Sequence, residues 1–228
     1  MNKLNAPQYN LQITLMGGQS FAWDLTADGY VGFTRGRVIL LKQDGDNLIW
    51  ESFGQSQGHV QGQTDFLRNY LRLDEDYPNI LRKINKDKHM AAAMKEFSHT
   101  RLLKQDFEQC LLSFMISSNN SITNIRKSVR LLCQKLGPKV ELPDGILGAG
   151  LGHTIHLFPA TEDIAKASLQ TLLECKIGFR AKFVKAAAEA LAGGALNGAV
   201  KNNYPLLHEH ETREALMQIK GVGEKIAD

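Results

Sequence analysis

The chain has 228 residues, of which 43% are hydrophobic and 22% are charged, and its formal net charge at pH 7 is +3. These proportions are those of an ordinary globular protein and exclude a disordered or low-complexity chain. The sequence shows neither an apolar run that could cross a membrane nor a secretory hydrophobic segment at its start. We therefore expect a protein without an export signal, folded as one large domain or two small ones.

The positions of the charged residues and of the cysteines bear on the partner of the chain and on its redox compartment. Residues 1–99 carry 11 basic and 11 acidic residues, whereas residues 100–228 carry 16 and 13, so the whole excess lies in the second part. If the chain binds DNA, this part is favoured as the contact. Cys110, Cys133 and Cys175 are far apart and match no disulfide or zinc pattern, which predicts buried thiols in a reducing compartment.

Residues 1–99 read as an α+β domain. Short segments rich in β-branched and aromatic residues alternate with Gly-containing turns, a pattern typical of an antiparallel meander. The expected strands are Tyr9–Leu15, Ser20–Leu25, Tyr30–Thr34, Val38–Lys42 and Asn47–Phe53. Helices over Thr64–Leu73 and Lys86–Phe97 are expected to cover one face of this sheet, because an exposed apolar face needs a second layer.

Residues 100–228 read as an all-helical domain. Asp106 and Gln109 resemble a capping box ahead of a buried helix over Cys110–Ile116, and Asn120 or Ser121 can cap the next helix. That helix has apolar residues at helical spacing, namely Ile122, Ile125, Val129, Leu132 and Leu136. A loop is expected over Pro143–Pro159 and a short helix from Thr161. Further helices are expected from Phe183 to Gly193 and over Glu211–Ile219.

The last dozen residues hold a helix, a Gly221-Val222-Gly223 turn and the start of a second helix. Two glycines let the backbone approach a ligand closely, and unpaired N–H groups at the start of a helix bind anions such as phosphate. This is the helix-hairpin-helix DNA-backbone clamp. Lys225 lies in the first turn of the second helix, where the helix dipole disfavours an ammonium. On this motif alone, Lys225 is either a Schiff-base nucleophile or a phosphate contact.

Three stretches ahead of this turn carry a family resemblance. Gly17–Trp23 reads GGQSFAW, Gln105–Asn120 ends in SSNN, and Ile177–Phe183 reads IGFRAKF. In this order they resemble the 8-oxoguanine DNA glycosylase/AP lyases of the helix-hairpin-helix superfamily, over nearly the whole chain. The resemblance implies an α+β fold in which a TATA-binding-protein-like antiparallel domain (1–99) precedes an all-α glycosylase domain (100–228) that is incomplete at its C-terminus.

The resemblance also implies roles for single residues. Gly18 matches the glycine whose carbonyl senses the N7 hydrogen of the oxidised base, which is physically sensible because a buried acceptor discriminates N–H from a lone pair. Asn119 matches the asparagine that fills the gap left by the extruded base. Phe179 matches an aromatic wedge and Arg180 an arginine that reads the orphaned cytosine. Asn124 stands where many members have a second cytosine-reading arginine, a departure that weakens the expectation of strict cytosine preference.

Lys225 matches the catalytic lysine, and the hairpin Gly221, Val222 and Gly223 matches the phosphate clamp. The resemblance therefore implies base extrusion, attack of Lys225 on the sugar C1′, and strand nicking by β-elimination. It implies double-stranded DNA containing oxidised guanine as partner and no cofactor or metal. A monomer without membrane association is expected, in the cytoplasm with the nucleoid if the source is bacterial.

The family places an aspartate and further base-pocket residues beyond the lysine's helix, whereas this sequence stops at Asp228. We expect a fragment of a full glycosylase in preference to a natural short form. We also expect greatly reduced activity of the 228-residue chain, because losing charge stabilisation at the transition state costs orders of magnitude.

Three alternatives stay open. One is an endonuclease III-like glycosylase, whose members lack a strand-rich first domain. Another is an alkylpurine glycosylase, which lacks a lysine at the position of Lys225. The third is a non-catalytic DNA-binding module. The His153/His156 and His208/His210 pairs lack a third ligand, which disfavours a metal site.

Overall fold

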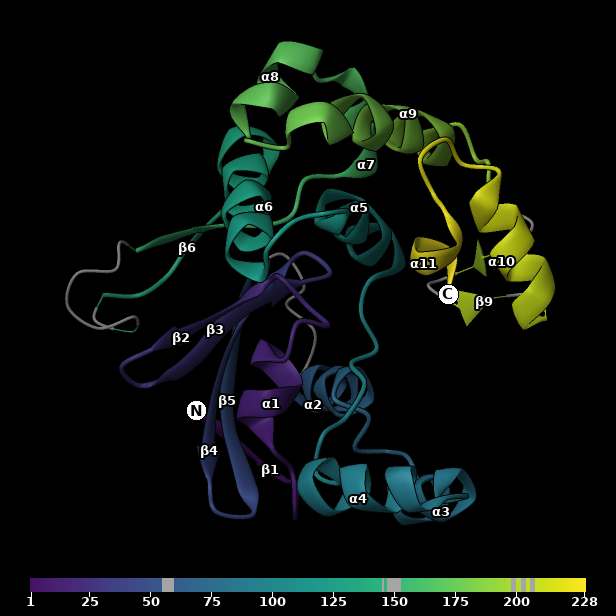
Figure 1. The fold of residues 1–228 in the computed structure, drawn as a ribbon. Coiled ribbons are helices and arrows are strands. Elements are labelled where there is room, and N and C mark those ends of the chain that lie inside the picture. The colour runs from purple at the N-terminus through teal and green to yellow at the C-terminus, as the bar shows by residue number, and fades with distance from the viewer. Residues whose placement is uncertain (55–59, 145, 147–152, 198–199, 202–203, 206–207) are drawn as a thin grey trace.

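The computed structural model of the protein (Figure 1) describes residues 1–54, 60–144, 146, 153–197, 200–201, 204–205 and 208–228. Its first part is a five-stranded antiparallel sheet with the strand order β1-β5-β4-β3-β2. The strands are β1 (Asn2–Asn5), β2 (Trp23–Thr26), β3 (Gly29–Thr34), β4 (Arg37–Asp44) and β5 (Asn47–Gly54). This confirms the predicted antiparallel α+β fold, although β1, which pairs with β5, was not predicted.

The expected first strand is wrong, because Leu11–Met16 forms helix α1. The Asn10 side chain caps this helix by accepting a hydrogen bond from the Ile13 amide at 3.0 Å. Its buried residues, Leu11, Thr14 and Leu15, follow helical spacing. The β-branched and apolar composition of this segment suits either structure, and the cap together with the burial of one helical face favours the helix.

Helix α2 (Val60–Tyr70) covers one face of the sheet together with α1 (Figure 1). Trp23 of β2 is fully buried, and its indole N–H donates to the hydroxyl of Tyr70 at 2.9 Å. The prediction that Lys86–Phe97 also covers the sheet is wrong. Helices α3 (Tyr77–Ile84), which was not predicted, and α4 (Lys88–Phe97) bury no residue and lie to one side of the sheet.

The second part is mainly helical. Its helices are α5 (Phe107–Ser117), α6 (Ile122–Leu136), α7 (Thr161–Lys166), α8 (Leu169–Glu174), the 3-10 turn η1 (Gly178–Arg180), α9 (Ala181–Ala192), α10 (Glu209–Met217) and α11 (Glu224–Ala227). Asp106 caps α5 by accepting from the Gln109 amide at 3.0 Å, and Ser121 caps α6 by accepting from the Asn124 amide at 3.3 Å. These caps fix where the two central helices begin.

Two short pairs of strands accompany the helices of this part, in addition to what the sequence predicts. β6 (Lys139–Glu141) pairs with β7 (Thr154–His156), and β8 (Val200–Lys201) pairs with β9 (Tyr204–Pro205). The expected loop over 143–159 thus contains β7, while residues 145 and 147–152 of it lie outside the described residues. Strands of two or three residues are too short to produce an alternating pattern in the sequence.

The core of α6 follows the predicted stripe except at its first residue. Ile125, Val129 and Leu132 are buried, whereas Ile122 is 47% exposed. Within the described ranges every helix is too short or too polar to cross a bilayer.

Candidate functional site

The Gly221–Gly223 turn connects α10 to α11 and packs against α9. Gly221 has a φ of +96°, and a Cβ built on it would lie only 2.7 Å from the Cβ of Phe183. Only glycine fits here without displacing α9. Val222 is buried, and its amide donates to the carbonyl of Ile219 at 3.0 Å. The two glycines on either side of it are exposed, so their backbone faces solvent where a ligand can approach.

Lys225 is the second residue of α11 and is exposed. The following residues, Ile226 and Ala227, are partly buried against the core, so the helix has one anchored face and one solvent face. Arg213 of α10 holds both ends of this helix. Its Nε donates to Oδ1 of Asp228 at 2.5 Å, and its Nη2 lies 3.7 Å from Oε1 of Glu224. Lys225 therefore lies in the sequence between Glu224 and Asp228, whose carboxylates both contact Arg213.

Asn119 and Arg180 come together from distant parts of the sequence. Arg180 is buried, and its guanidinium donates to the carbonyls of Ser118 at 2.5 Å and Asn119 at 2.8 Å, as well as to that of Ile177 at 3.3 Å. Asn119 is exposed with a φ of +50°, a conformation that asparagine tolerates better than most residues. In this structure Arg180 thus holds the loop that carries Asn119.

Phe179 is the exposed member of this group. It is 61% exposed, and the guanidinium carbon of Arg180 lies 4.4 Å from the centre of its ring. An exposed aromatic ring beside an exposed asparagine loop is the arrangement that a wedge into a base stack requires. The structure brings Phe179 and Asn119 to the surface around the buried Arg180, which contacts both.

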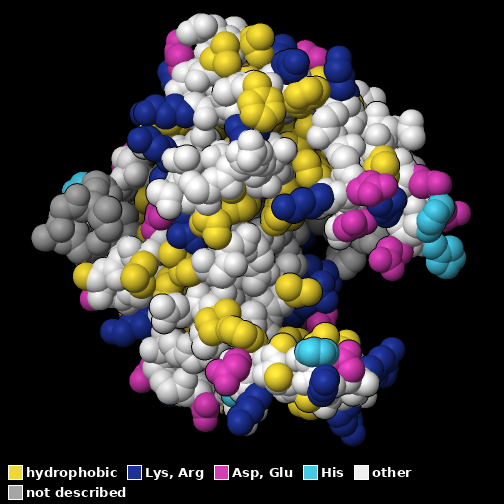
Figure 2. All heavy atoms as spheres, in the orientation of Figure 1, with side chains coloured by type: hydrophobic (Ala, Val, Ile, Leu, Met, Phe, Trp, Pro, Cys, Tyr) yellow, Lys and Arg dark blue, Asp and Glu magenta, His cyan; other side chains and the backbone are white. Residues whose placement is uncertain are grey.

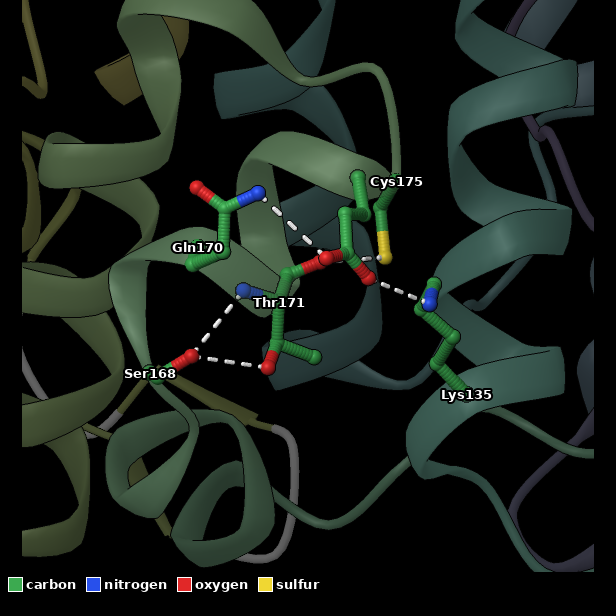
Figure 3. Close-up of polar contacts among 6 residues, drawn as sticks. Lys135, Ser168, Gln170, Thr171 and Cys175 are labelled. Carbon is green, nitrogen blue, oxygen red and sulfur yellow. Dashed lines mark hydrogen bonds and ion pairs between the residues drawn. The ribbon is translucent and has the colours of Figure 1, made fainter.

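Helix α8 fixes the position of the turn that bears Phe179. Figure 3 shows its first turn capped by Ser168, whose hydroxyl accepts from the Thr171 amide at 3.0 Å. Its last residue, Glu174, forms an ion pair with Lys135 of α6 at 2.7 Å. Just beyond it, Ser128 of α6 donates to the carbonyl of Lys176 at 3.1 Å. The chain therefore enters η1 from a segment attached to α6.

Gly18 lies directly after α1 and has a φ of +94°. A Cβ built on it would lie 3.1 Å from Cδ1 of Ile122, the first residue of α6. Gly18 is thus brought next to the helix whose preceding loop contains Asn119. Asn124 is exposed, and its amide is used in the Ser121 cap.

Three arrangements at this site carried no role in the sequence analysis. Gln19 and Arg126 hold the segment around Gly18, and Arg213 holds α11. Gln19 lies within the GGQSFAW motif, so the sequence contains a signal that could have indicated its importance. The partners of Arg126 and Arg213 depend on tertiary structure and leave no pattern in the sequence.

Charge is unevenly distributed around the site. In Figure 2 acidic and histidine side chains gather over α10, whose residues include Glu209, His210, Glu211 and Glu214. The exposed cation Lys182 at the start of α9 lies beside Phe183, with Nζ 4.9 Å from the ring centre. The turn of residues 221–223 therefore lies between an acidic helix and a basic helix start. Among the described residues no three His, Cys, Asp or Glu side chains form a metal-ligating group.

Known proteins resemble this chain in sequence and in fold. The family model described as 8-oxoguanine DNA glycosylase, N-terminal domain, matches residues 3–111. The N-glycosylase/DNA lyase of Saccharomyces cerevisiae is 28% identical over 99% of this chain, and N-glycosylase/DNA lyase OGG1 of Arabidopsis thaliana is 29% identical over 99%. The apo crystal structure of the Clostridium acetobutylicum 8-oxoguanine glycosylase/lyase superposes with a TM-score of 0.84 at 25% identity, covering 100% of this chain and 75% of that one.

Residues 3–111 thus match the N-terminal domain of the 8-oxoguanine DNA glycosylase family, and nearly the whole chain is similar to N-glycosylase/DNA lyases. It spans 62% and 60% of the lengths of the yeast and Arabidopsis relatives, respectively. The described sheet and the mainly helical region that follows it are the fold of this family.

Proposed function

We propose that this chain carries the catalytic lysine and the DNA-reading surface of a bifunctional 8-oxoguanine DNA glycosylase/AP lyase of base excision repair. Its substrate is double-stranded DNA in which an oxidised guanine is turned out of the stack. The support comes from the similarity of the chain to N-glycosylase/DNA lyases together with the exposure of Lys225 beside the phosphate-clamp turn.

The proposed chemistry starts at the Lys225 amine and ends in a break of the DNA strand. The Lys225 amine donates its lone pair to C1′, the bond from C1′ to the base breaks, and the base leaves with the electron pair and is protonated. Opening of the sugar gives an imine between Nζ and C1′, which acidifies the C2′ proton. Loss of that proton expels the 3′ phosphate and nicks the strand.

One observation carries the proposal more than any other. Lys225 is exposed on a four-residue helix whose opposite face is anchored and whose two ends are held by Arg213. The preceding turn offers exposed glycine backbone for a phosphate. A lysine held this way meets the sugar of a nucleotide whose phosphate rests on the turn, which supplies the proximity that covalent catalysis requires.

Borohydride trapping tests the proposal. Incubating the 228-residue chain with a duplex containing 8-oxoguanine opposite cytosine, or an abasic site, in the presence of borohydride should give a covalent protein–DNA adduct. Lys225→Gln should abolish the adduct on both duplexes. Lys220→Gln, which removes an exposed lysine five residues earlier, should leave it.

The same experiment decides between the proposal and its alternatives. A non-catalytic DNA-binding module would bind the duplex in a mobility-shift assay and form no adduct. A glycosylase of another branch would form an adduct on a duplex with an oxidised pyrimidine and none with 8-oxoguanine, or would release an alkylated purine without any adduct. An adduct that survives Lys225→Gln would show that another amine reacts.

A further inference from the structure

One face of α6 contacts the segment that surrounds Gly18. Ile122, Arg126 and Arg130 are four residues apart and therefore lie on one side of the helix. Their contacts all fall between Met16 and Asp24, in the region of the sheet. We call these three residues the α6 stripe.

Each member of the stripe makes a different kind of contact. Ile122 lies against Gly18. Arg126 donates from Nη2 to the carbonyl of Met16 at 3.4 Å and lies 3.7 Å from the Met16 sulfur. Arg130 forms an ion pair with Asp24. The Nε of Arg126 is buried without a hydrogen-bond partner, so this side chain gives up one bond to water to reach Met16.

The other side of Gly18 is held equally closely. The side chain of Gln19 donates to the carbonyls of Thr14 and Arg101, both at 2.8 Å, and accepts from the Leu103 amide at 2.8 Å. The carbonyl of Gln19 accepts from the Gln105 side chain at 2.6 Å. Gly18 thus lies between a residue fixed by four hydrogen bonds and a carbonyl held by α6, and its position depends on both.

The same helix begins at the loop that contains Asn119. That loop is held by the guanidinium of Arg180, and α6 starts immediately after it with the Ser121 cap. The lesion-sensing glycine, which lies against Ile122, and the asparagine, which lies three residues before Ile122, therefore both meet the start of α6. A shift of α6 relative to the sheet would move one against the other.

We propose that Arg126, supported by Ile122 and Arg130, is a positioning residue that determines lesion specificity by setting the place of Gly18 relative to Asn119. This inference rests on the proposed function. Recognition of the N7–H by a carbonyl is sensitive to distance and angle, because a hydrogen bond weakens steeply outside its normal geometry. Cleavage at an abasic site involves no base and does not use Gly18. Loss of Arg126 should therefore affect excision of the base and spare strand cleavage at an abasic site.

The test compares Arg126→Met with the unmodified 228-residue chain on matched duplexes that contain 8-oxoguanine or an abasic site opposite cytosine. We expect the single-turnover rate of 8-oxoguanine excision to fall about tenfold, the change produced by a barrier increase of about 1.4 kcal/mol. We expect cleavage of the abasic duplex to change by less than about twofold, since the lysine and the turn are untouched. The ratio of the two rates cancels any general loss of DNA affinity.

Two further variants serve as controls. Lys127→Met removes an exposed cation from the next position of α6 and should leave the ratio of the two rates unchanged. Arg130→Asp should lower the ratio, and adding Asp24→Arg should restore it, because the swap rebuilds the ion pair with its charges exchanged. Urea unfolding of each variant shows whether the fold is kept. A merely structural role of the stripe would move both rates together and would leave their ratio unchanged.

The outcomes separate this inference from the proposed function. Equal loss on both duplexes, or no loss on either, in a chain that forms the borohydride adduct overturns the role of Arg126 and leaves the proposed function standing. If the unmodified chain forms no adduct, the proposed function is wrong. The inference is then tested by binding: Arg126→Met must reduce the preference of the chain for an 8-oxoguanine duplex over a guanine duplex. If the unmodified chain shows no such preference, the inference is overturned.

Discussion

The hydrogen bonds of Arg180 within the protein limit its availability to contact DNA. The family resemblance implies that it reads an orphaned cytosine, and in the structure its guanidinium donates to three protein carbonyls. An arginine suits this position because its planar group reaches several acceptors at once, which a lysine cannot do. To contact a base it must release part of this network, so its contribution to binding depends on the loop that it holds.

Replacing Arg180 with lysine should therefore destabilise the protein. Lysine keeps the charge but leaves carbonyls of residues 118, 119 and 177 without a partner, at a cost of about 1–3 kcal/mol. The urea midpoint should fall accordingly with the slope unchanged. Lys182→Gln, two residues later at an exposed position, is the control and should leave the midpoint in place. An unchanged midpoint for Arg180→Lys would mean that the hydrogen bonds contribute little.

Asn124 is the residue at which this chain departs from many members of the family. It is exposed and its amide belongs to the Ser121 cap. We expect Asn124→Arg to sharpen the preference for cytosine over adenine opposite the lesion, by about 1–3 kcal/mol if the new guanidinium makes a bidentate base contact. Competition binding with duplexes that differ only in the opposite base measures it. Asn124→Lys, which adds charge without the planar group, should raise affinity for all duplexes alike. If Asn124→Arg raises the affinity for all duplexes equally, residue 124 does not contact the opposite base.

At the scale of the element, α11 is too short to be stable alone. A helix of four residues gains little from its own hydrogen bonds and depends on tertiary contacts. Arg213 supplies two of them, to Glu224 and Asp228, and the Asp228 carboxylate raises the pKa of its guanidinium. The chemistry proposed for Lys225 needs this helix to be ordered. We therefore expect the order of α11 to depend on Arg213.

Arg213→Gln should increase local opening of α11 without unfolding the protein. The ion pairs are largely exposed and contribute only modestly, so the open form should become at most about several-fold more populated. Limited trypsin digestion detects this as faster cleavage after Lys225. His210→Gln, at an exposed position one turn earlier, is the control. If cleavage after Lys225 is equally fast in both variants, α11 is held by its apolar face alone.

The elements also show what sequence patterns can predict. The strands β3, β4 and β5 and the helices α5, α6 and α9 were predicted because caps, turn glycines and long apolar stripes mark them. Residues 9–15 were read as a strand, since their composition suits both structures and the Asn10 cap alone separates them. The site residues likewise divide into those that sequence motifs indicate and those that only the tertiary structure reveals. Motifs indicated Gly18, Asn119 and Lys225, whereas Arg126 and Arg213 act through partners distant in sequence.

At the scale of the whole molecule, the sheet and the helical region are joined through polar contacts as well as through packing. Gln19 binds the segment of residues 101–105 that leads from one to the other. Phe21 packs against Phe114 of α5 with ring centres 5.5 Å apart. A glycosylase must turn a base out of the stack and read it from two sides, which requires the two regions to keep a fixed relation.

The core of the helical region contains cysteine thiols whose ionisation is suppressed. Burial raises the pKa of Cys133 to about 12, and burial together with the nearby Asp106 carboxylate raises that of Cys110 to about 11. Burial also raises the pKa of the Tyr9 and Tyr70 hydroxyls. In the unfolded chain a cysteine ionises near its ordinary value of about 8.5. Between that pH and the folded value the unfolded chain holds fewer protons than the native protein, so raising the pH favours unfolding.

We therefore predict that stability is fully present below about pH 8.5 and falls as the pH rises toward 11, because each fully protected thiol costs about 1.4 kcal/mol per pH unit in this window. Urea unfolding at pH 8, 9 and 10 gives the free energy at each pH. Cys133→Ala lowers stability at every pH by opening a small cavity, but it should make the fall between pH 9 and 10 less steep. The exposed Lys127→Met variant should keep the original steepness. Equal steepness in Cys133→Ala and the unmodified chain would mean that this thiol ionises alike in both states, and that the fall comes from the tyrosines and the other two cysteines.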